Sequence, residues 1–434
     1  MKRIFASVGF AALGVSTLHA QYSPGVSAAE STAPRGWTVA ATVREFYDDN
    51  YTTQPHGLSS YGEEASPSAA LNSILNGGNT TLALSYVYDL KHYERTDTTD
   101  SSHQFNARVN ERFSERYSLQ IGESFIVAQA PDVLNGGTDQ RVSGANVHND
   151  GSLTFTGALT PSLDLQLSYA NDLYAFQQTF GDVYNPNPKA LNPSYSALLD
   201  RMVQPVTLNL DWKMMDQLTA IIGYTYQNTD FTSPEPIVFD GLPGAESYAN
   251  PKNIHSNIRN NDSHFFFVGA DWQMASQVTG RIRVGGEYLD YYKADSTSVG
   301  PYVDASLTWL YMKGSTLQGG ITHQHSATDV VGGVSKSGQP VLDAETTSAY
   351  LSLSQSIGGS LTANLMGQFQ HAVFNGGTVN GQTEDFFVGG LNLAYRFSPN
   401  FLAEGGYNWN KLVSDVSERD YTRDIVYLGV RATY

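Results

Sequence analysis

The histidines are the first residues whose types and spacing could do chemistry. His323 and His325 stand two positions apart, so on a strand they would share one face. Two such imidazoles, with His371 nearby, could ligate a metal. The alternation of the flanking residues instead places all three on the outward face at the outer rim, so we predict no metal site and no cofactor. The chain holds ten histidines, and no Ser-His-Asp or Ser-His-Asn set can be assembled from them by spacing, so we do not predict an enzyme.

Asp48-Asp49-Asn50 is a second candidate, since three oxygen-bearing side chains in a row could bind calcium. A calcium-loop motif also needs a glycine at its turn and a distal glutamate at fixed spacing, and this segment has neither at those positions. We therefore predict a solvated turn here. The chain has no cysteine, which excludes disulfides and thiolate metal sites.

The remaining charged candidates recur on one face of alternating segments. A face that carries charge at every second position suits the wall of a water-filled channel, where charges bias which solutes enter. Many could instead pair across neighbouring strands and only stiffen the wall. The predicted pore-lining residues are Arg44, Lys91, Arg108, Arg112, Asp164, Asp211, Asp271, Arg281, Arg283, Glu287, Asp304, Arg396, Glu404, Arg423 and Arg431. We expect most of the remaining acidic residues, such as Asp48, Glu63 and Glu64, to lie in loops.

Strands must position these residues, and the last strand shows the pattern best. Val426, Leu428, Val430 and Ala432 share one face, and the chain stops on the aromatic Tyr434. One apolar and one polar face define a strand between two environments. A chain ending in such a strand resembles the outer-membrane barrels of Gram-negative bacteria.

Eighteen segments of this kind follow one another, although a count of sixteen is also compatible with the pattern. The sequence thus predicts an all-β, antiparallel, up-and-down transmembrane barrel. The segments are 36–47, 64–76, 79–93, 100–114, 116–129, 147–159, 161–178, 202–214, 216–230, 262–275, 277–293, 300–313, 315–327, 345–357, 359–373, 384–397, 399–412 and 421–434. A large soluble sandwich or propeller is the alternative.

The connections alternate in length, which favours the barrel. Short turns such as Asn76-Gly77-Gly78 would lie on the periplasmic side and the long loops on the outer side. The long connections are 48–63, 130–146, 179–201, 231–261 and 328–344. The longest, 231–261, could fold inward and narrow the pore or stand outward as a contact surface.

Two features concern the lipid-facing surface. Aromatic residues gather near strand ends, as in the girdles of such barrels: Trp37, Tyr117, Trp212, Trp272, Trp309, Tyr311, Phe397, Phe401 and Trp409. Glu111 and Glu123 also fall on the lipid-facing side, where charge is costly. Glu111 would sit at the periplasmic rim, and Glu123 would mark a bulge, a shifted register or a subunit contact.

The N-terminus and the charge limit location and partners. Residues 1–20 have the basic start and apolar centre of a signal peptide, and residues 21–35 would form a short periplasmic segment before a barrel over 36–434. Without Lys2 and Arg3, the 25 basic residues fall to 23 against 42 acidic ones, a net charge of −19. Such a charge argues against nucleic acid as a partner. We expect the cell outer membrane as location, with no plug domain before the barrel and no domain after it.

The opening strand carries a more specific resemblance. Residues 37–47 run Trp-Thr-Val-Ala-Ala-Thr-Val-Arg-Glu-Phe-Tyr and continue into Asp48-Asp49-Asn50. This start, followed by repeated hairpins, resembles the putative beta-barrel porin 2 family. The resemblance implies a porin-like outer-membrane protein and no catalytic residues.

The sequence therefore predicts a channel for passive diffusion of small hydrophilic solutes or ions. A specific export or uptake barrel, for polysaccharide or another solute, and a non-conducting barrel acting through its outer loops remain alternatives. The expected partners are outer-membrane lipid, the barrel-assembly machinery through the strand ending at Tyr434, the solutes and, in an oligomer, further copies of the chain.

Overall fold

A computed structural model describes residues 36–128, 146–179, 193–240, 250–331, 334 and 338–434. The predicted signal peptide 1–20 and the segment 21–35 lie outside the described residues. Parts of four long connections do so as well.

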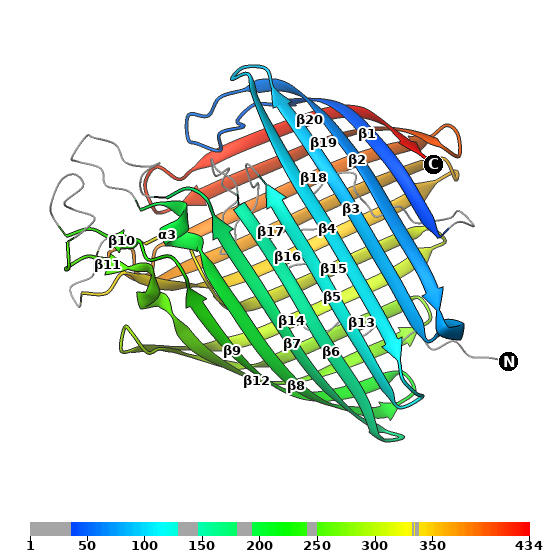
Figure 1. The fold of residues 1–434 in the computed structure, drawn as a ribbon, viewed down its shortest axis with the longest axis horizontal. Helices are drawn as coiled ribbons and strands as arrows, with labels where there is room; N and C mark the ends of the chain where they lie inside the picture. Colours follow the sequence, from blue (N-terminus) through cyan, green and yellow to red (C-terminus); the bar gives the residue numbers. More distant parts are fainter. Residues whose placement is uncertain (1–35, 129–145, 180–192, 241–249, 332–333, 335–337) are drawn as a thin grey trace.

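Eighteen strands form one closed antiparallel sheet, in which each strand pairs with its neighbours along the chain (Figure 1). The strands are β1 (Trp37–Asp48), β2 (Ser60–Leu75), β3 (Thr80–Tyr93), β4 (Thr98–Arg112), β5 (Tyr117–Ala128), β6 (Asn146–Thr160), β7 (Leu163–Phe176), β8 (Arg201–Met215), β9 (Leu218–Phe231), β12 (Asn261–Ala275), β13 (Val278–Tyr291), β14 (Ser296–Met312), β15 (Ser315–Ser326), β16 (Val341–Ile357), β17 (Leu361–Gly376), β18 (Thr383–Arg396), β19 (Phe401–Ser414) and β20 (Tyr421–Thr433). The predicted eighteen-stranded barrel is confirmed.

The barrel closes where β1 pairs with β20, over a register that runs from Ala40 opposite Thr433 to Asp48 opposite Ile425. At one end of this seam, Val39 and Tyr434 exchange two backbone hydrogen bonds, and the Trp37 and Tyr434 rings lie 5.7 Å apart. Closure leaves no strand edge of the described sheet unpaired, as a sheet in lipid requires.

Side chains alternate between the two faces of the sheet. In β1, Thr42 and Arg44 are buried while Val39 and Val43 on the other face are exposed. The exposed face is apolar in most strands, which suits contact with lipid, and the inner face is polar. Six of the predicted girdle residues are exposed: Trp37, Tyr117, Trp212, Trp309, Phe397 and Phe401.

The connections differ in length at the two ends of the barrel. At the short-turn end, strands are joined by two to four residues; Gly358 and Gly359, with φ of 60° and 79°, make one such turn possible. The long-loop end carries the helices α3 (Tyr195–Leu199) and η2 (Ser256–Arg259) and the small hairpin of β10 (Pro236–Val238) and β11 (Ile254–His255). A third short helix, η1 (Asn76–Gly78), lies at the short-turn end. None of the helices in the described ranges is long and apolar enough to cross a membrane.

Three strands begin four residues earlier than predicted, all at the long-loop end: β2, β14 and β16. At two of these strand ends the sequence carries acidic side chains, which are typical of loops. In the extended part of β2, Glu63 lies opposite Glu45 of β1, and in that of β16 Asp343 accepts a hydrogen bond from Tyr291. The strand pairing therefore extends further than hydropathy indicates.

Candidate functional site: the barrel interior and its cap

The strand registers place all fifteen predicted pore-lining residues on the inner face. Arg108, for example, lies opposite Gly122, which lies opposite the cavity residue Ser152. Whether a solute passes along these side chains remains a prediction.

Most of these inner-face charges bind one another. Fewer of the predicted residues can therefore interact with a solute than their number implies. Arg44 bonds Glu64 at 2.7 Å and Glu404 at 2.5 Å, which ties β1 to β2 and β19. Further ion pairs of the inner face are Arg281–Asp304, Arg283–Asp271 at 2.8 Å, Lys213–Asp164 at 2.7 Å, Arg423–Asp48 at 2.7 Å and Lys91–Asp89 at 3.8 Å. Arg108, Arg112 and Arg396 make no salt bridge within the described ranges, whereas Asp211 and Arg431 lie among charged neighbours.

The Asp48-Asp49-Asn50 turn is not solvated, contrary to the sequence prediction. Asp48 is 1% exposed and binds Arg423 of β20, while Asn50 donates to the backbone oxygen of Thr422 at 2.9 Å. Asp49 exchanges hydrogen bonds with Asp424 at 3.1 and 2.7 Å. The turn therefore fastens β1 to β20 at the long-loop end of the seam. Glu63 and Glu64 also leave the predicted loop set, since both lie in β2.

The histidine prediction is partly wrong. β15 stops pairing with β14 after His323, and His325 is buried rather than outward. Its Nδ1 lies 2.6 Å from Glu287, and its Nε2 lies 3.9 Å from Asp343. His323 bonds Thr347 at 2.7 Å, and His371 bonds Asp385 at 2.7 Å. Within the described residues no three His, Asp or Glu side chains are arranged to hold a metal.

The two lipid-facing glutamates have polar neighbours. Thr80 donates to Glu111 at 2.5 Å near the short-turn end. Glu123 accepts from Asn149 of β6, and the glycine opposite it, Gly151, leaves room for the carboxylate. β5 and β6 pair without a register shift at Glu123, so no bulge is present there.

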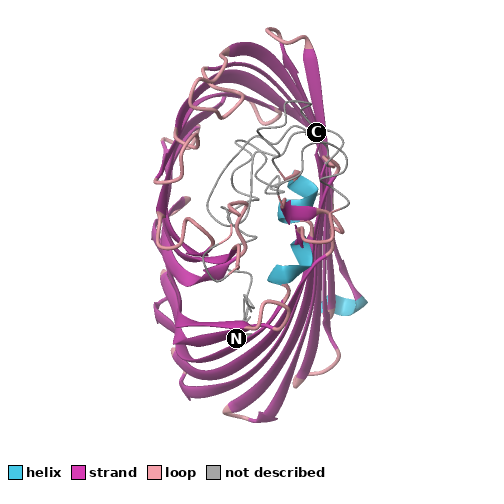
Figure 2. Cartoon of the chain, turned by 90° about the vertical axis from the view of Figure 1, so that its left-hand side faces the viewer, coloured by secondary structure: helices cyan, strands magenta, loops and turns pink. Residues whose placement is uncertain are grey.

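A cap of loop segments covers part of the long-loop end. In the view along the barrel, the short helices of these loops lie within the ring of strands (Figure 2). The cap is built from α3 and from the described parts of 231–261 and 328–331. Its apolar centre consists of Phe176, Ala197, Leu198, Leu199, Ile237 and Val331, all buried. The described parts of the longest loop thus lie over the mouth rather than standing away from it.

Arg259 of η2 holds the cap together. It is fully buried and donates to the backbone oxygens of Ala197 and Leu198 at 3.1 and 2.6 Å and of Thr328 at 2.9 Å. Its guanidinium lies 4.0 Å from the centre of the Phe231 ring. Burial, and then the nearby charge of Arg201, lower the pKa of Arg259 to about 9.

Two carboxylate contacts complete the cap. Asp200, directly after α3, accepts from Ser196 at 2.6 Å and from the Phe176 N–H at 2.7 Å. Burial raises the pKa of Asp200 to about 6 despite these hydrogen bonds. Arg419, between β19 and β20, binds Glu384 at 2.7 Å and Asp329 at 3.1 Å. Burial would lower the pKa of Arg419, but these two carboxylates raise it above its ordinary value.

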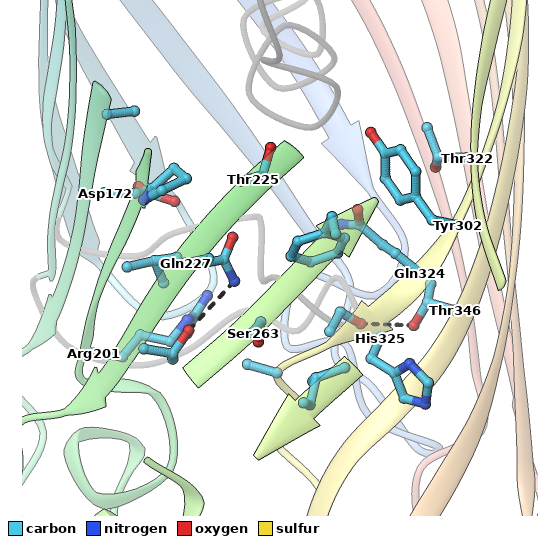
Figure 3. Close-up of a pocket in the computed structure, with 18 of the residues that line it drawn as sticks. Asp172, Arg201, Thr225, Gln227, Ser263, Tyr302, Thr322, Gln324, His325 and Thr346 are labelled. Carbon is cyan, nitrogen blue, oxygen red and sulfur yellow. Dashed lines mark hydrogen bonds between the residues drawn. The ribbon is translucent and has the colours of Figure 1, made fainter. Parts of the chain in front are cut away.

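A cavity of about 360 Å³ lies inside the barrel, lined by strands from β5 to β17. Gln227 and Thr225 come from β9, whereas Tyr302, Thr322 and Gln324 come from β14 and β15 (Figure 3). The volume falls within the range of about 300–1,000 Å³ that is common for small-molecule sites. Sequence patterns did not predict this cavity because its lining is mostly uncharged.

A closed antiparallel barrel with an apolar outer face and a polar interior defines the class of transmembrane outer-membrane β-barrels. Residues 244–434 match the family model described as Putative beta-barrel porin 2, which confirms over that range the resemblance expected from the sequence. The opening motif that suggested it lies outside the matched residues. The chain is thus a porin-like outer-membrane β-barrel embedded in lipid, and the family that it matches is typically without catalytic activity.

Solved structures of similar fold come from two bacterial species. OccAB3 of Acinetobacter baumannii is 11% identical, with a TM-score of 0.41 over 92% of this chain and 99% of that one. OccK2 (OpdF) of Pseudomonas aeruginosa, solved in complex with glucuronate, is 11% identical, with a TM-score of 0.44 over 92% and 98%. The outer membrane protein opdK of Pseudomonas aeruginosa is 11% identical, with a TM-score of 0.42 over 92% and 99%. No curated protein matches the sequence.

Proposed function

We propose that the protein is an outer-membrane channel through which small hydrophilic solutes diffuse passively. The observation that supports this most is the polar interior of a closed barrel wide enough to hold a solute-sized cavity. Because most inner-face charges are already paired, the wall offers mainly uncharged polar groups to a solute. In this proposal the cap sets the size limit at the outer mouth, and residues 1–20 direct export.

Single-channel recording of refolded protein in a planar bilayer tests the proposal. We expect steady conductance steps that grow in proportion to salt concentration, since ions would cross an aqueous path. Folding is checked separately by the shift in gel mobility between unheated and heated protein. A folded barrel that produces no steps would contradict the proposal and favour a closed barrel that acts through its outer loops.

A further inference from the structure

We propose that the cavity inside the barrel is a binding site for a neutral, hydroxyl-rich solute, such as a sugar or polyol. The inference rests on the proposed function and specifies the solute class. Nothing in the sequence pattern or the family points to this site. It is derived from which side chains line the cavity and which of them are already bonded.

The uncharged polar side chains dominate the lining. Serine, threonine, glutamine and asparagine supply 17 of the lining side chains, against seven that are charged or histidine. A hydroxyl or a carboxamide both donates and accepts hydrogen bonds. Such a wall matches a solute whose own groups also do both, which is the property of a sugar hydroxyl.

The charged side chains of the lining already contact protein groups. His148 bonds Asp172 at 2.7 Å, and Asp304 binds Arg281. Arg201 donates to the Leu199 carbonyl at 3.0 Å and lies 4.0 Å from the centre of the Tyr174 ring. The lining carries Asp150, Asp172, Asp304 and Asp343 but one arginine, so an anionic solute would meet net negative charge.

Aromatic rings in the cavity lining also suit a sugar. Tyr302 lies against Phe265, with ring centres 5.5 Å apart, and both line the cavity. Tyrosine offers an apolar ring together with a polar hydroxyl. A sugar ring has the same division, with C–H groups on its faces and hydroxyls at its edge, so ring faces and carboxamides can bind it together.

Uptake by proteoliposomes tests the site with three probes of one shape. Labelled glucose is neutral, glucuronate is anionic and glucosamine is cationic. We expect glucose influx to saturate with concentration and to be inhibited by unlabelled glucose more strongly than by the charged analogues.

The variants Gln227→Leu and Gln324→Leu each remove one hydrogen-bonding group, and we expect each to raise the half-saturating concentration roughly three- to tenfold. Gln217→Leu, the same change in the β8–β9 turn outside the cavity lining, is the matched control and should leave uptake unchanged.

The outcomes separate this inference from the proposed function. Glucose influx that rises linearly without saturation, in a conducting barrel, would overturn the site and leave the channel. Saturation by a charged analogue alone would overturn the neutral class. If the folded barrel does not conduct, the proposed function fails, and saturation-transfer NMR of glucose with the detergent-solubilised protein decides the site: no transfer, or equal transfer with both glutamine variants, would overturn it.

Discussion

Arg259 shows how a single buried side chain can organise the outer mouth. A guanidinium carries five N–H donors in a fixed fork, so it can serve several carbonyl oxygens at once. Here it joins α3, the loop after β15 and its own loop, while no carboxylate forms a salt bridge with it in the described part of the chain. Arg44 has a similar role in the wall, where its partners are carboxylates of two strands.

Replacing Arg259 by methionine should release the cap without unfolding the barrel. Each hydrogen bond to a charged group contributes roughly 1.5–3 kcal/mol. The loss removes the Arg259 donor from the Leu198 and Thr328 carbonyls, while the Ala197 carbonyl keeps its hydrogen bond from Ser256. We expect the single-channel conductance of Arg259→Met to rise at least twofold. The heat-induced gel shift should occur at the same temperature as in the wild type.

Lys252→Met is the matched control, because Lys252 carries the same charge in the same loop but is largely exposed and lies 3.9 Å from Asp240. Unchanged conductance in Arg259→Met would mean that the cap does not limit the pore. A large drop in the temperature of the gel shift would show that Arg259 stabilises the barrel instead.

At the scale of the element, α3 and the segment after it make the cap sensitive to pH. Asp200 has a pKa of about 6 where it is buried against Phe176 and Ser196, compared with 3.8 when exposed. Glu235 raises this pKa further and Arg201 lowers it. The docked cap therefore holds a proton that the released cap would lose, so docking is favoured below pH 4, and that contribution is lost as pH rises to about 6.

We therefore expect channel openings to be rarer at pH 4.5 than at pH 7.5. The variant Asp200→Asn keeps an acceptor for the Phe176 N–H but does not titrate, so it should reduce the difference between the two pH values. The measurement is the open probability of single channels in the same salt. An equal open probability for the wild type at both values would refute the role of Asp200.

The strands could be predicted from sequence because their signal is local. Val426, Leu428 and Val430 alternate with polar neighbours, and two environments on either side of a sheet impose that alternation directly. The partners of individual charges could not be predicted. Asp48 binds Arg423, a residue 375 positions away, and no local pattern records which strand closes onto β1.

The position of His325 and the role of Arg259 could not be predicted from the sequence, for related reasons. His325 leaves the expected face where β15 stops pairing with β14 beyond His323, and period-two counting cannot detect where a strand pairing ends. Arg259 has no sequence signature because its partners are backbone carbonyls, which every residue has. The cap was therefore visible in sequence only as a long loop.

At the scale of the whole molecule, charge is distributed unevenly along the pore. The whole chain carries a net charge of −17. The inner face near the short-turn end carries Arg108, Arg112 and Arg396, whereas the cavity lining holds four aspartates and one arginine. In the proposed channel, ions would pass the cavity beneath the cap, so its charges should dominate selectivity.

We therefore expect a cation-selective channel. Under a tenfold gradient of potassium chloride, the reversal potential should have the sign of potassium moving down its gradient. Raising both concentrations should shrink it, because the Debye length falls from about 10 Å at 0.1 M to 3 Å at 1 M. The double variant Arg108→Gln/Arg112→Gln should shift the potential further toward cations by a small amount, while Asp172→Asn should shift it back. An anion-selective wild type would show that the arginines of the short-turn end, and not the aspartates of the cavity, control which ions cross.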